Sequence, residues 1–282
     1  MTRKLTPYLL IIPACVLFLV FCVAPIGIVA VQSLWRTNYI VSEFVGLRNY
    51  LRIFTDDDTL RVISNSFAYS ALIVPGYMAI ALTVVMLTFN AKPWLQAYSR
   101  FAFYLPTVIA GVILSMVWRW GFHPVGGLAN WLLGLVGLGP YMWMAGRWSA
   151  IVGISIVIVM ASGGGTIVIL QAATLSINHE IIDAARIDGA SWLQVKARIV
   201  LPIITPMILL LLLVSLIGTL QIYETIYVMY PVADAHNLMF DVYWTAFTRS
   251  RYGLASAKTM VLMGVILVAA VTQRLIQKRW AV

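Results

Sequence analysis

Six long apolar stretches, separated by shorter polar segments, follow one another along the chain. They cover residues 8–33, 66–90, 101–120, 149–171, 203–230 and 255–273. A helix needs about 20 residues to cross a hydrocarbon core of roughly 30 Å, and each stretch has close to this length or more. Backbone amides find no water in lipid, so a spanning segment is helical or belongs to a closed barrel. Apolar runs without alternation exclude the barrel. The pattern predicts an all-α integral membrane protein of about six transmembrane helices, with residues 1–282 as a single domain.

The composition agrees with lipid as the solvent for most of the chain. Hydrophobic residues make up 62% and charged residues only 10%, whereas about 25% of residues are charged in soluble domains. The net charge of +9 fits residence beside anionic lipid and gives no reason to expect a nucleic-acid partner.

The first apolar stretch begins like a secretory signal, because Arg3 and Lys4 precede it. Its length exceeds the roughly 7 to 15 residues of a signal core, and no small-x-small cleavage motif ends it. We therefore interpret it as a retained signal-anchor helix and expect both termini in the cytoplasm. The distribution of Lys and Arg between the predicted sides is nearly even, so the positive-inside rule supports this orientation only weakly.

The polar loop at residues 176–202, between the fourth and fifth stretches, is the most informative segment. Asn178 can cap a helix whose first turn holds Glu180, where a negative charge meets the positive end of the helix dipole. Asp188-Gly189 would end this helix near Ile187, because Gly adopts the left-handed conformation that commonly closes a helix. A second helical stretch over residues 190–200 would then lead to Pro202 in the first turn of the fifth span.

The first predicted helix of this loop, and the residues that follow it directly, carry both small and charged side chains. The small ones permit close approach of another surface, and the charged ones can fix its register through charge-assisted hydrogen bonds. An ordinary solvated loop is the alternative, with about even weight on physical grounds alone. The candidate residues are Asp183, Ala184, Ala185, Arg186, Asp188, Gly189 and Ala190.

The pattern Asp-Ala-Ala-x-x-Asp-Gly-Ala from Asp183, followed by Leu201-Pro202, resembles the EAA loop of binding-protein-dependent ABC importer permeases. The resemblance implies a coupling helix that sits in a cleft of a cytoplasmic ATPase subunit, with the seven candidate residues at the contact. The chain departs from the family pattern in two places. Asp183 stands where the family has glutamate, and Asn178-His179 replaces an Ile-Pro type of entry.

The resemblance extends over nearly the whole chain. The segments 8–13, 44–50 and 252–257 look like landmarks of the sugar-importer branch, and they are more similar to the F-type than to the G-type permease of the maltose system. The Gly-Gly-Pro turn expected after the fifth span is replaced by residues 230–236. We therefore expect this outer loop to meet its binding protein or substrate differently.

The resemblance implies the type I permease fold of ABC importers and a set of partners. These are a G-type permease forming a heterodimer, two cytoplasmic ABC ATPase subunits, an external solute-binding protein and a carbohydrate cargo, in a bacterial or archaeal cytoplasmic membrane. The chain has no Gly-x-x-x-x-Gly-Lys-Ser/Thr phosphate loop. ATP and Mg would therefore be bound by the partner ATPase, and the chain itself would be a transport subunit without enzymatic activity or a cofactor.

Polar and aromatic side chains cluster near the predicted outer half of the fifth span. They are Gln221, Tyr223, Glu224 and Tyr227. An ionisable group within a span is costly and usually faces a cavity or a partner, and hydrogen-bonding groups beside flat rings suit a sugar. We predict that these residues line the substrate path. Contact with the sister subunit is the alternative, and a cation such as a polyamine, or a glycerol phosphodiester, is the alternative cargo.

Two further patterns involve residue types that often carry chemistry. Gly163-Gly164-Gly165 in the fourth span would weaken a helix by roughly 1 kcal/mol per residue, and close helix packing explains it better than a substrate role. The three histidines and two cysteines, His123, His179, His236, Cys15 and Cys22, lack metal-ligand spacing. We predict neither a metal site nor a catalytic centre.

Two other classes of membrane protein compete with the importer interpretation. A secondary transporter would show inverted repeats with broken helices and ion-coupling residues in corresponding halves. A membrane-embedded hydrolase would need a nucleophile with a base, or a metal constellation, inside the spans. The sequence shows neither pattern.

Overall fold

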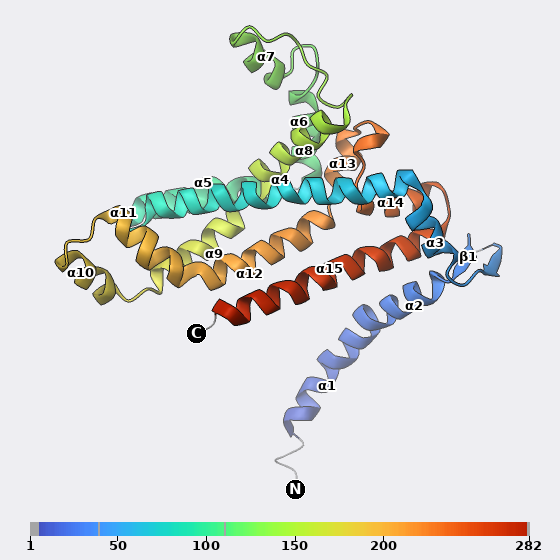
Figure 1. Cartoon of the computed structure of the whole chain (residues 1–282), viewed down its shortest axis with the longest axis horizontal. Coiled ribbons are helices and arrows are strands. Elements are labelled where there is room, and N and C mark those ends of the chain that lie inside the picture. The colour runs from blue at the N-terminus through green and yellow to red at the C-terminus, as the bar shows by residue number, and fades with distance from the viewer. Residues whose placement is uncertain (1–5, 39, 110, 281–282) are drawn as a thin grey trace. The chain divides into compact units, whose positions relative to one another are not determined.

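A computed structural model describes residues 6–38, 40–109 and 111–280, which are almost entirely helical (Figure 1). The chain divides into two compact units. Unit 1 combines Met1–Leu60 with Asp241–Val265, and unit 2 combines Arg61–Phe240 with Ile266–Val282. The helices α4 (Asp57–Thr88), α14 (Leu238–Tyr243) and α15 (Tyr252–Trp280) contribute residues to both units.

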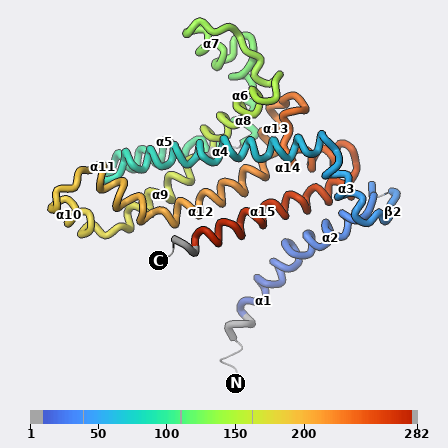
Figure 2. The backbone as a smooth tube through the Cα atoms, in the orientation of Figure 1, coloured from blue at the N-terminus to red at the C-terminus, as the bar shows by residue number. Residues whose placement is uncertain are grey.

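Unit 1 begins with one long helix, seen as a continuous coil in Figure 2. It consists of α1 (Thr6–Phe18), the π-helical turn η2 (Leu19–Val23) and α2 (Ala24–Gln32). The short strands β1 (Trp35–Thr37) and β2 (Ser42–Phe44) follow as an antiparallel hairpin with Arg36 opposite Glu43. This hairpin is a small departure from the all-α prediction. The unit is completed by α3 (Arg48–Thr55) and the π-helical turn η5 (Trp244–Thr248) that precedes α15.

Hydrogen bonds hold α3 against the end of α2. The Ser33 Oγ and Tyr50 hydroxyl oxygens lie 2.7 Å apart, and Asn49 Nδ2 donates to the carbonyl oxygens of Ser33 at 2.8 Å and Trp35 at 3.0 Å. At Gly253 in α15, a Cβ atom would lie only 1.8 Å from the Trp35 carbonyl oxygen. Only glycine therefore fits where α15 passes this turn.

Unit 2 contains most of the remaining helices. They are α5 (Pro93–Val108), α6 (Gly111–Gly121), α7 (Leu128–Leu135), α8 (Arg147–Ser162), α9 (Gly164–Leu175), α10 (His179–Ile187), α11 (Trp192–Val195), η3 (Lys196–Val200), α12 (Leu201–Leu220), α13 (Glu224–Met229) and η4 (Ala233–Ala235). One buried apolar cluster joins α4, α9 and α12, with Ile167 and Leu170 of α9 fully buried at its centre. A second cluster lies where α10 and α11 meet the end of α4.

The helices account for the six predicted spans. By length and composition, Leu10–Gln32, Asp57–Thr88, Trp192–Leu220 and Tyr252–Gln277 can each cross a membrane. The pairs α5 with α6, bent by 90°, and α8 with α9, bent by 49°, bring the number among the described residues to six if each pair is one span. The predicted end of the fifth span at residue 230 is wrong. Helix α12 ends at Leu220, and a break separates it from α13.

Candidate functional site

The loop between α9 and α12 folds as two short helices, and the cap and the end of the first were predicted. Asn178 Oδ1 accepts a hydrogen bond from the Glu180 backbone N–H at 3.0 Å, and α10 ends at Ile187. Gly189 follows with φ +83°, which a residue with a Cβ rarely adopts. Ser191 then caps α11, because its Oγ accepts from the Gln194 N–H while Gln194 Oε1 accepts from the Ser191 N–H.

This helical pair is anchored on one side. Ile182 of α10 and Val195 of α11 are buried together with Phe89, which follows α4. The Arg186 guanidinium lies 4.7 Å from the centre of the Trp192 ring, an arrangement that favours the cation over the aromatic face. These contacts make the loop an ordered element rather than a mobile connection.

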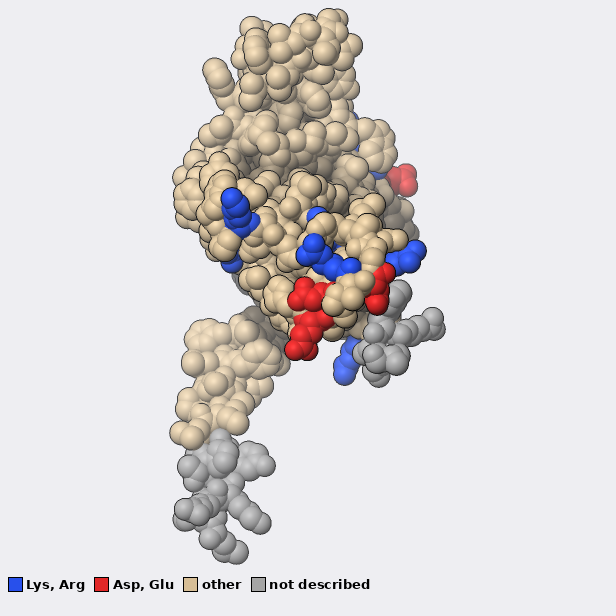
Figure 3. Space-filling model, turned by 90° about the vertical axis from the view of Figure 1, so that its left-hand side faces the viewer, with Lys and Arg blue, Asp and Glu red and all other residues tan. Residues whose placement is uncertain are grey.

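The other side of the helical pair faces outward. Of the seven predicted coupling residues, Asp183, Ala184, Arg186, Asp188 and Gly189 are exposed, while Ala185 and Ala190 are half-buried. The apolar side chains of Ile187 and Leu193 are 87% and 77% exposed. Sequence reasoning missed these two, although an apolar residue within a polar loop is a usable signal. Figure 3 looks from the side on which α10 lies in Figure 1 and shows acidic and basic side chains together on that face.

A cavity of about 470 Å³ lies where three helix breaks of unit 2 converge. Thr107 and Gly111 line it from either side of the α5–α6 break, and Ala161 and Gly165 from either side of the α8–α9 bend. Further lining comes from four residues around the α12–α13 break: Gly218, Thr219, Ile222 and Thr225. Irregular backbone at membrane depth is tolerated where it is buried in protein or lines a cavity, and broken helices commonly form transport sites.

The lining of this cavity combines hydroxyl groups with aliphatic side chains. Ser115 Oγ donates to the Gly111 carbonyl oxygen at 2.7 Å and lies 3.2 Å from Thr225 Oγ1, whose own hydroxyl can donate to it. None of the lining residues carries a charge. The hydroxyl-bearing members are Tyr77, Thr107, Ser115, Thr166, Ser215, Thr219 and Thr225. Such a surface can bind a neutral, hydroxyl-rich solute.

The predicted path residues lie beside this cavity in the sequence but do not line it. Gln221, Glu224 and Tyr227 are exposed and Tyr223 is half-buried. The intervening Ile222 and Thr225 face the cavity instead. The break between α12 and α13 turns neighbouring residues to different sides. The prediction of a continuous fifth helix did not include this break.

The glycine run at the α8–α9 bend serves packing. A Cβ at Gly164 would lie 2.3 Å from the Phe103 carbonyl oxygen and 2.6 Å from Tyr104 Cα, so α9 and α5 approach at backbone distance. The predicted packing role is confirmed at this position. Gly165 has open space beside it and lines the cavity.

The segment at residues 230–238 is held by hydrogen bonds from α4, and it includes residues 230–236, which replace the expected Gly-Gly-Pro turn. Asn65 Nδ2 donates to the carbonyl oxygens of Asp234 and His236, both at 2.7 Å. The Tyr69 hydroxyl donates to the Ala235 carbonyl oxygen at 3.0 Å, and Arg61 pairs with the Asp234 carboxylate at 2.6 Å. This segment is therefore an ordered part of unit 2.

Comparison with known proteins decides the family. Residues 78–282 match the family described as binding-protein-dependent transport system inner membrane component. The chain belongs to this family. It is thus a multi-pass membrane permease, and the resemblance drawn from its loop and spans is confirmed.

Individual relatives of this permease cover nearly its whole length. The arabinooligosaccharides transport system permease protein AraP of Halalkalibacterium halodurans is 28% identical over 96% of this chain and 87% of its own. The sn-glycerol-3-phosphate transport system permease protein UgpA of Salmonella typhimurium is 27% identical over 95% of this chain and 92% of its own. A crystal structure of a bacterial ABC transporter that imports the acidic polysaccharide alginate has the same fold. Its matching chain gives a TM-score of 0.85 at 23% identity and covers 100% of this chain and 98% of that chain.

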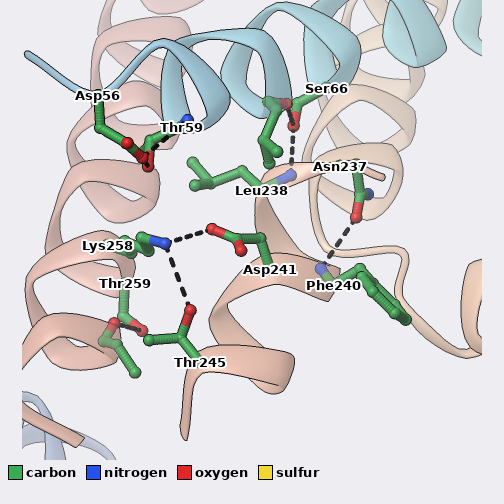
Figure 4. Close-up of polar contacts among 12 residues, drawn as sticks. Asp56, Thr59, Ser66, Asn237, Leu238, Phe240, Asp241, Thr245, Lys258 and Thr259 are labelled. Atoms are coloured by element: carbon green, nitrogen blue, oxygen red, sulfur yellow. Dashed lines mark hydrogen bonds and ion pairs between the residues drawn. The ribbon is translucent and has the colours of Figure 1, made fainter. Parts of the chain in front are cut away.

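Unit 1 of the permease holds a polar cluster that sequence reasoning missed (Figure 4). Lys258, within the sixth span, pairs with Asp241 and donates to Thr245 Oγ1 at 3.3 Å. Nearby, Asp56 accepts from the Thr59 hydroxyl at 2.5 Å and the Thr59 N–H at 3.2 Å. These hydrogen bonds, with further help from the charges of Lys258 and Arg52, lower the pKa of the Asp56 carboxyl despite its partial desolvation. A lone lysine in an apolar stretch is the signal that could have pointed to this cluster.

Metal ligation has no geometric basis in the described parts of the chain. No group of three or more His, Cys, Asp or Glu side chains gathers there in a way that could hold a metal ion.

Proposed function

We propose that this permease is a transmembrane subunit of an ATP-driven importer and forms, with a second six-helix permease, the path for a carbohydrate delivered by an external solute-binding protein. The observation that carries the proposal is the ordered α10–α11 pair. It is anchored by a buried cluster around Ile182 and presents Ile187, Leu193 and charged side chains outward. Such a rigid projection suits a cleft in a cytoplasmic partner.

In this proposal, two ABC ATPase subunits bind ATP and Mg, and each permease contributes one coupling loop. Apolar side chains such as Ile187 would fill the cleft, while Asp183, Arg186 and Asp188 would fix its register by charge-assisted hydrogen bonds. A ligand shifts a conformational equilibrium only through differential affinity. The loop must therefore bind the two states of the ATPase dimer differently, so that ATP-driven closure and hydrolysis alternate the access of the path.

The orientation follows from the same proposal. The α10 loop must meet a cytoplasmic ATPase, so both termini lie in the cytoplasm and the β1–β2 hairpin lies outside. The membrane would be the cytoplasmic membrane of a bacterium or archaeon.

The cargo is argued from the cavity at the three helix breaks. Hydroxyl groups such as Ser115 and Thr225 can exchange hydrogen bonds with sugar hydroxyls, and aliphatic walls suit the C–H faces. A relative named for arabinooligosaccharides supports a sugar. Gln221, Tyr223, Glu224 and Tyr227 remain predicted path residues, with contact to the sister permease as the alternative.

A glycerol phosphodiester or a polyamine is the alternative cargo, and the glycerol-3-phosphate relative favours the former. A charged solute leaving water needs an opposite charge or many hydrogen bonds in its site. The lining residues of the cavity are uncharged. This observation favours a neutral carbohydrate.

The coupling role is tested by recovering partners of the tagged chain from its native membrane. The Asp183→Lys, Gly189→Asp double variant should lose the ATPase subunits and keep the second permease. The matched control, Asp57→Lys with Gly46→Asp, changes the same residue types outside the loop and also places Asp at a positive-φ glycine. Recovery of the intact chain alone, or equal loss from both double variants, would contradict the proposal.

The cargo is tested separately with the reassembled complex in proteoliposomes. Uptake of a neutral oligosaccharide, with no uptake of a glycerol phosphodiester or polyamine, is the expected result. Uptake of only a charged solute would overturn the carbohydrate assignment while leaving the coupling role intact.

A further inference from the structure

Unit 1 contains a basic pocket of about 670 Å³ between the β1–β2 hairpin, α3 and the segment just before α15. Thirteen residues line it, and Glu43 is the single acid among them. The pocket has five arginines, all exposed: Arg36, Arg48, Arg52, Arg249 and Arg251. An anionic ligand is the natural complement of this charge.

The acidic residues near these arginines balance their charge only in part. Arg48 and Arg52 lie one turn apart on α3, where like charges repel. Glu43 faces Arg36 across the hairpin, and Arg52 is close enough to Asp56 to lower the pKa of that carboxyl. The structure records no ion pair for any of the five guanidinium groups within the described ranges. A cluster with such an excess of positive charge gains stability when an anion enters.

The position of the pocket along the chain sets its depth in the membrane. One candidate span ends at Gln32, four residues before Arg36, and another begins at Tyr252, directly after Arg251. These two spans, of 23 and 26 residues, are close to the length that a hydrocarbon core needs. Arg36 and Arg251 therefore lie near the end of the core, at the level of phospholipid headgroups, and the other arginines line the same pocket.

Helix α3 has the surface of a helix that lies in the membrane interface. Ile53 is buried, and Arg48 and Arg52 form the basic face. Leu51 and Phe54, on the remaining face, are exposed together with the preceding Leu47. A helix with adjacent basic and apolar faces places the one at headgroup phosphates and the other at acyl chains.

We propose that this pocket binds the phosphate headgroup of an anionic phospholipid, whose acyl chains lie along the apolar face of α3. Guanidinium groups match phosphate oxygens in bidentate geometry. A soluble anion would explain the arginines but not their depth or the exposed Leu51 and Phe54. The site is independent of the cargo path and of the coupling loop.

The test is native mass spectrometry of the purified full-length chain with phosphatidylglycerol or zwitterionic phosphatidylethanolamine. A basic side chain near a membrane surface contributes about fivefold to the binding of anionic lipid. The Arg48→Gln, Arg251→Gln variant should therefore bind phosphatidylglycerol about 25-fold more weakly, with phosphatidylethanolamine binding unchanged. The control, Arg198→Gln with Arg274→Gln, removes two exposed arginines outside the pocket and should leave phosphatidylglycerol binding as in the intact chain.

Two further arms keep the outcome decisive. The Arg48→Lys, Arg251→Lys variant retains charge but not bidentate geometry, and its affinity should fall between the intact chain and the Gln pair; it also serves if the Gln pair does not fold. Inorganic phosphate at the same concentration as the lipid should not displace phosphatidylglycerol. Equal loss in the control, no loss in the Gln or Lys pair, or displacement by inorganic phosphate would each overturn the lipid site.

Discussion

Lys258 Nζ lies 2.5 Å from Asp241 Oδ2, and the two side chains are only 5% and 15% exposed. Lys258 belongs to a candidate span, and Asp241 comes from α14. An ionisable group at membrane depth is retained only when it is paired or faces a cavity. The pair, with Thr245 as a third member, explains how a lysine is accommodated in the sixth apolar stretch.

Breaking this ion pair from one side should destabilise the permease strongly. Lys258→Met leaves the Asp241 carboxylate buried without its partner, and the loss of one partner of a buried pair costs about 3–5 kcal/mol. The double variant Lys258→Met, Asp241→Leu removes both charges and should lie closer to the intact chain than either single variant. Unfolding in detergent, followed by circular dichroism, measures all four proteins. Additive effects of the two substitutions would show that the contact carries no coupling energy.

Adding one methyl group at Gly164 should separate two helices. Its Cβ would meet the Phe103 carbonyl oxygen at 2.3 Å, and backbone cannot yield as the end of a flexible side chain can. We expect Gly164→Ala to cost roughly 1–3 kcal/mol through overpacking. Gly165→Ala is the matched control, since open space lies beside it and alanine favours a helix by up to about 1 kcal/mol. Equal unfolding temperatures for the two variants would contradict the packing role.

The hydrophobic pattern predicts the spans but not the places where they break. Six apolar runs are visible because lipid requires them. The sequence does not indicate that α12 ends at Leu220, since residues 221–230 contain neither glycine nor proline. The cavity is even less visible in the sequence. Thr107, Ser115 and Thr225 each look like ordinary small helix residues, and only the convergence of three breaks brings them together.

The loop at residues 176–202 was predictable because its signals are local. A cap at Asn178 and a positive φ at Gly189 depend on neighbours within one turn, so the sequence indicates them directly. The partner of Lys258 depends on a residue from another element, and the five arginines of the basic pocket come from three separate segments. The periodicity and spacing of residues along the sequence do not predict contacts of this kind, because they form between segments that are distant in the chain.

Asn65 should control the order of the segment at residues 230–238. Its side-chain amide donates to two carbonyl oxygens of that segment, and its Oδ1 accepts from Arg147 Nε at 2.9 Å. Asn65→Asp keeps the arginine contact but turns a donor into an acceptor that faces both carbonyl oxygens. Hydrogen exchange should become faster for the amides of residues 232–238. Ser64→Ala, at the exposed neighbour, should leave these rates nearly unchanged.

Asp56 should make the stability of the permease depend on acid. Its pKa is lowered in the folded state, chiefly by the Thr59 hydroxyl, so its contribution is complete above its ordinary pKa of 3.8. That contribution is lost as the pH falls through the lower folded-state pKa. Thr59→Val removes the hydroxyl that donates to Asp56 and should flatten this acid dependence. Unfolding temperatures between pH 7 and pH 3 test this, and an unchanged acid profile in Thr59→Val would contradict the assignment.

Ile187 should matter for partner binding and not for folding. Its side chain is 87% exposed on α10, so Ile187→Ser should change the free energy of unfolding by no more than about 0.5 kcal/mol. If the α10–α11 pair enters an ATPase cleft, the same change removes an apolar contact and should reduce ATPase recovery several-fold. Ile187→Val is the conservative control and should keep most of it. Ile182→Ala, at the buried position on the same helix, should instead lower stability by about 2–5 kcal/mol. If the Ile187→Ser variant recovers as much ATPase as the intact chain, Ile187 does not contact the ATPase. Misfolding would not explain that result, because the variant is expected to remain folded.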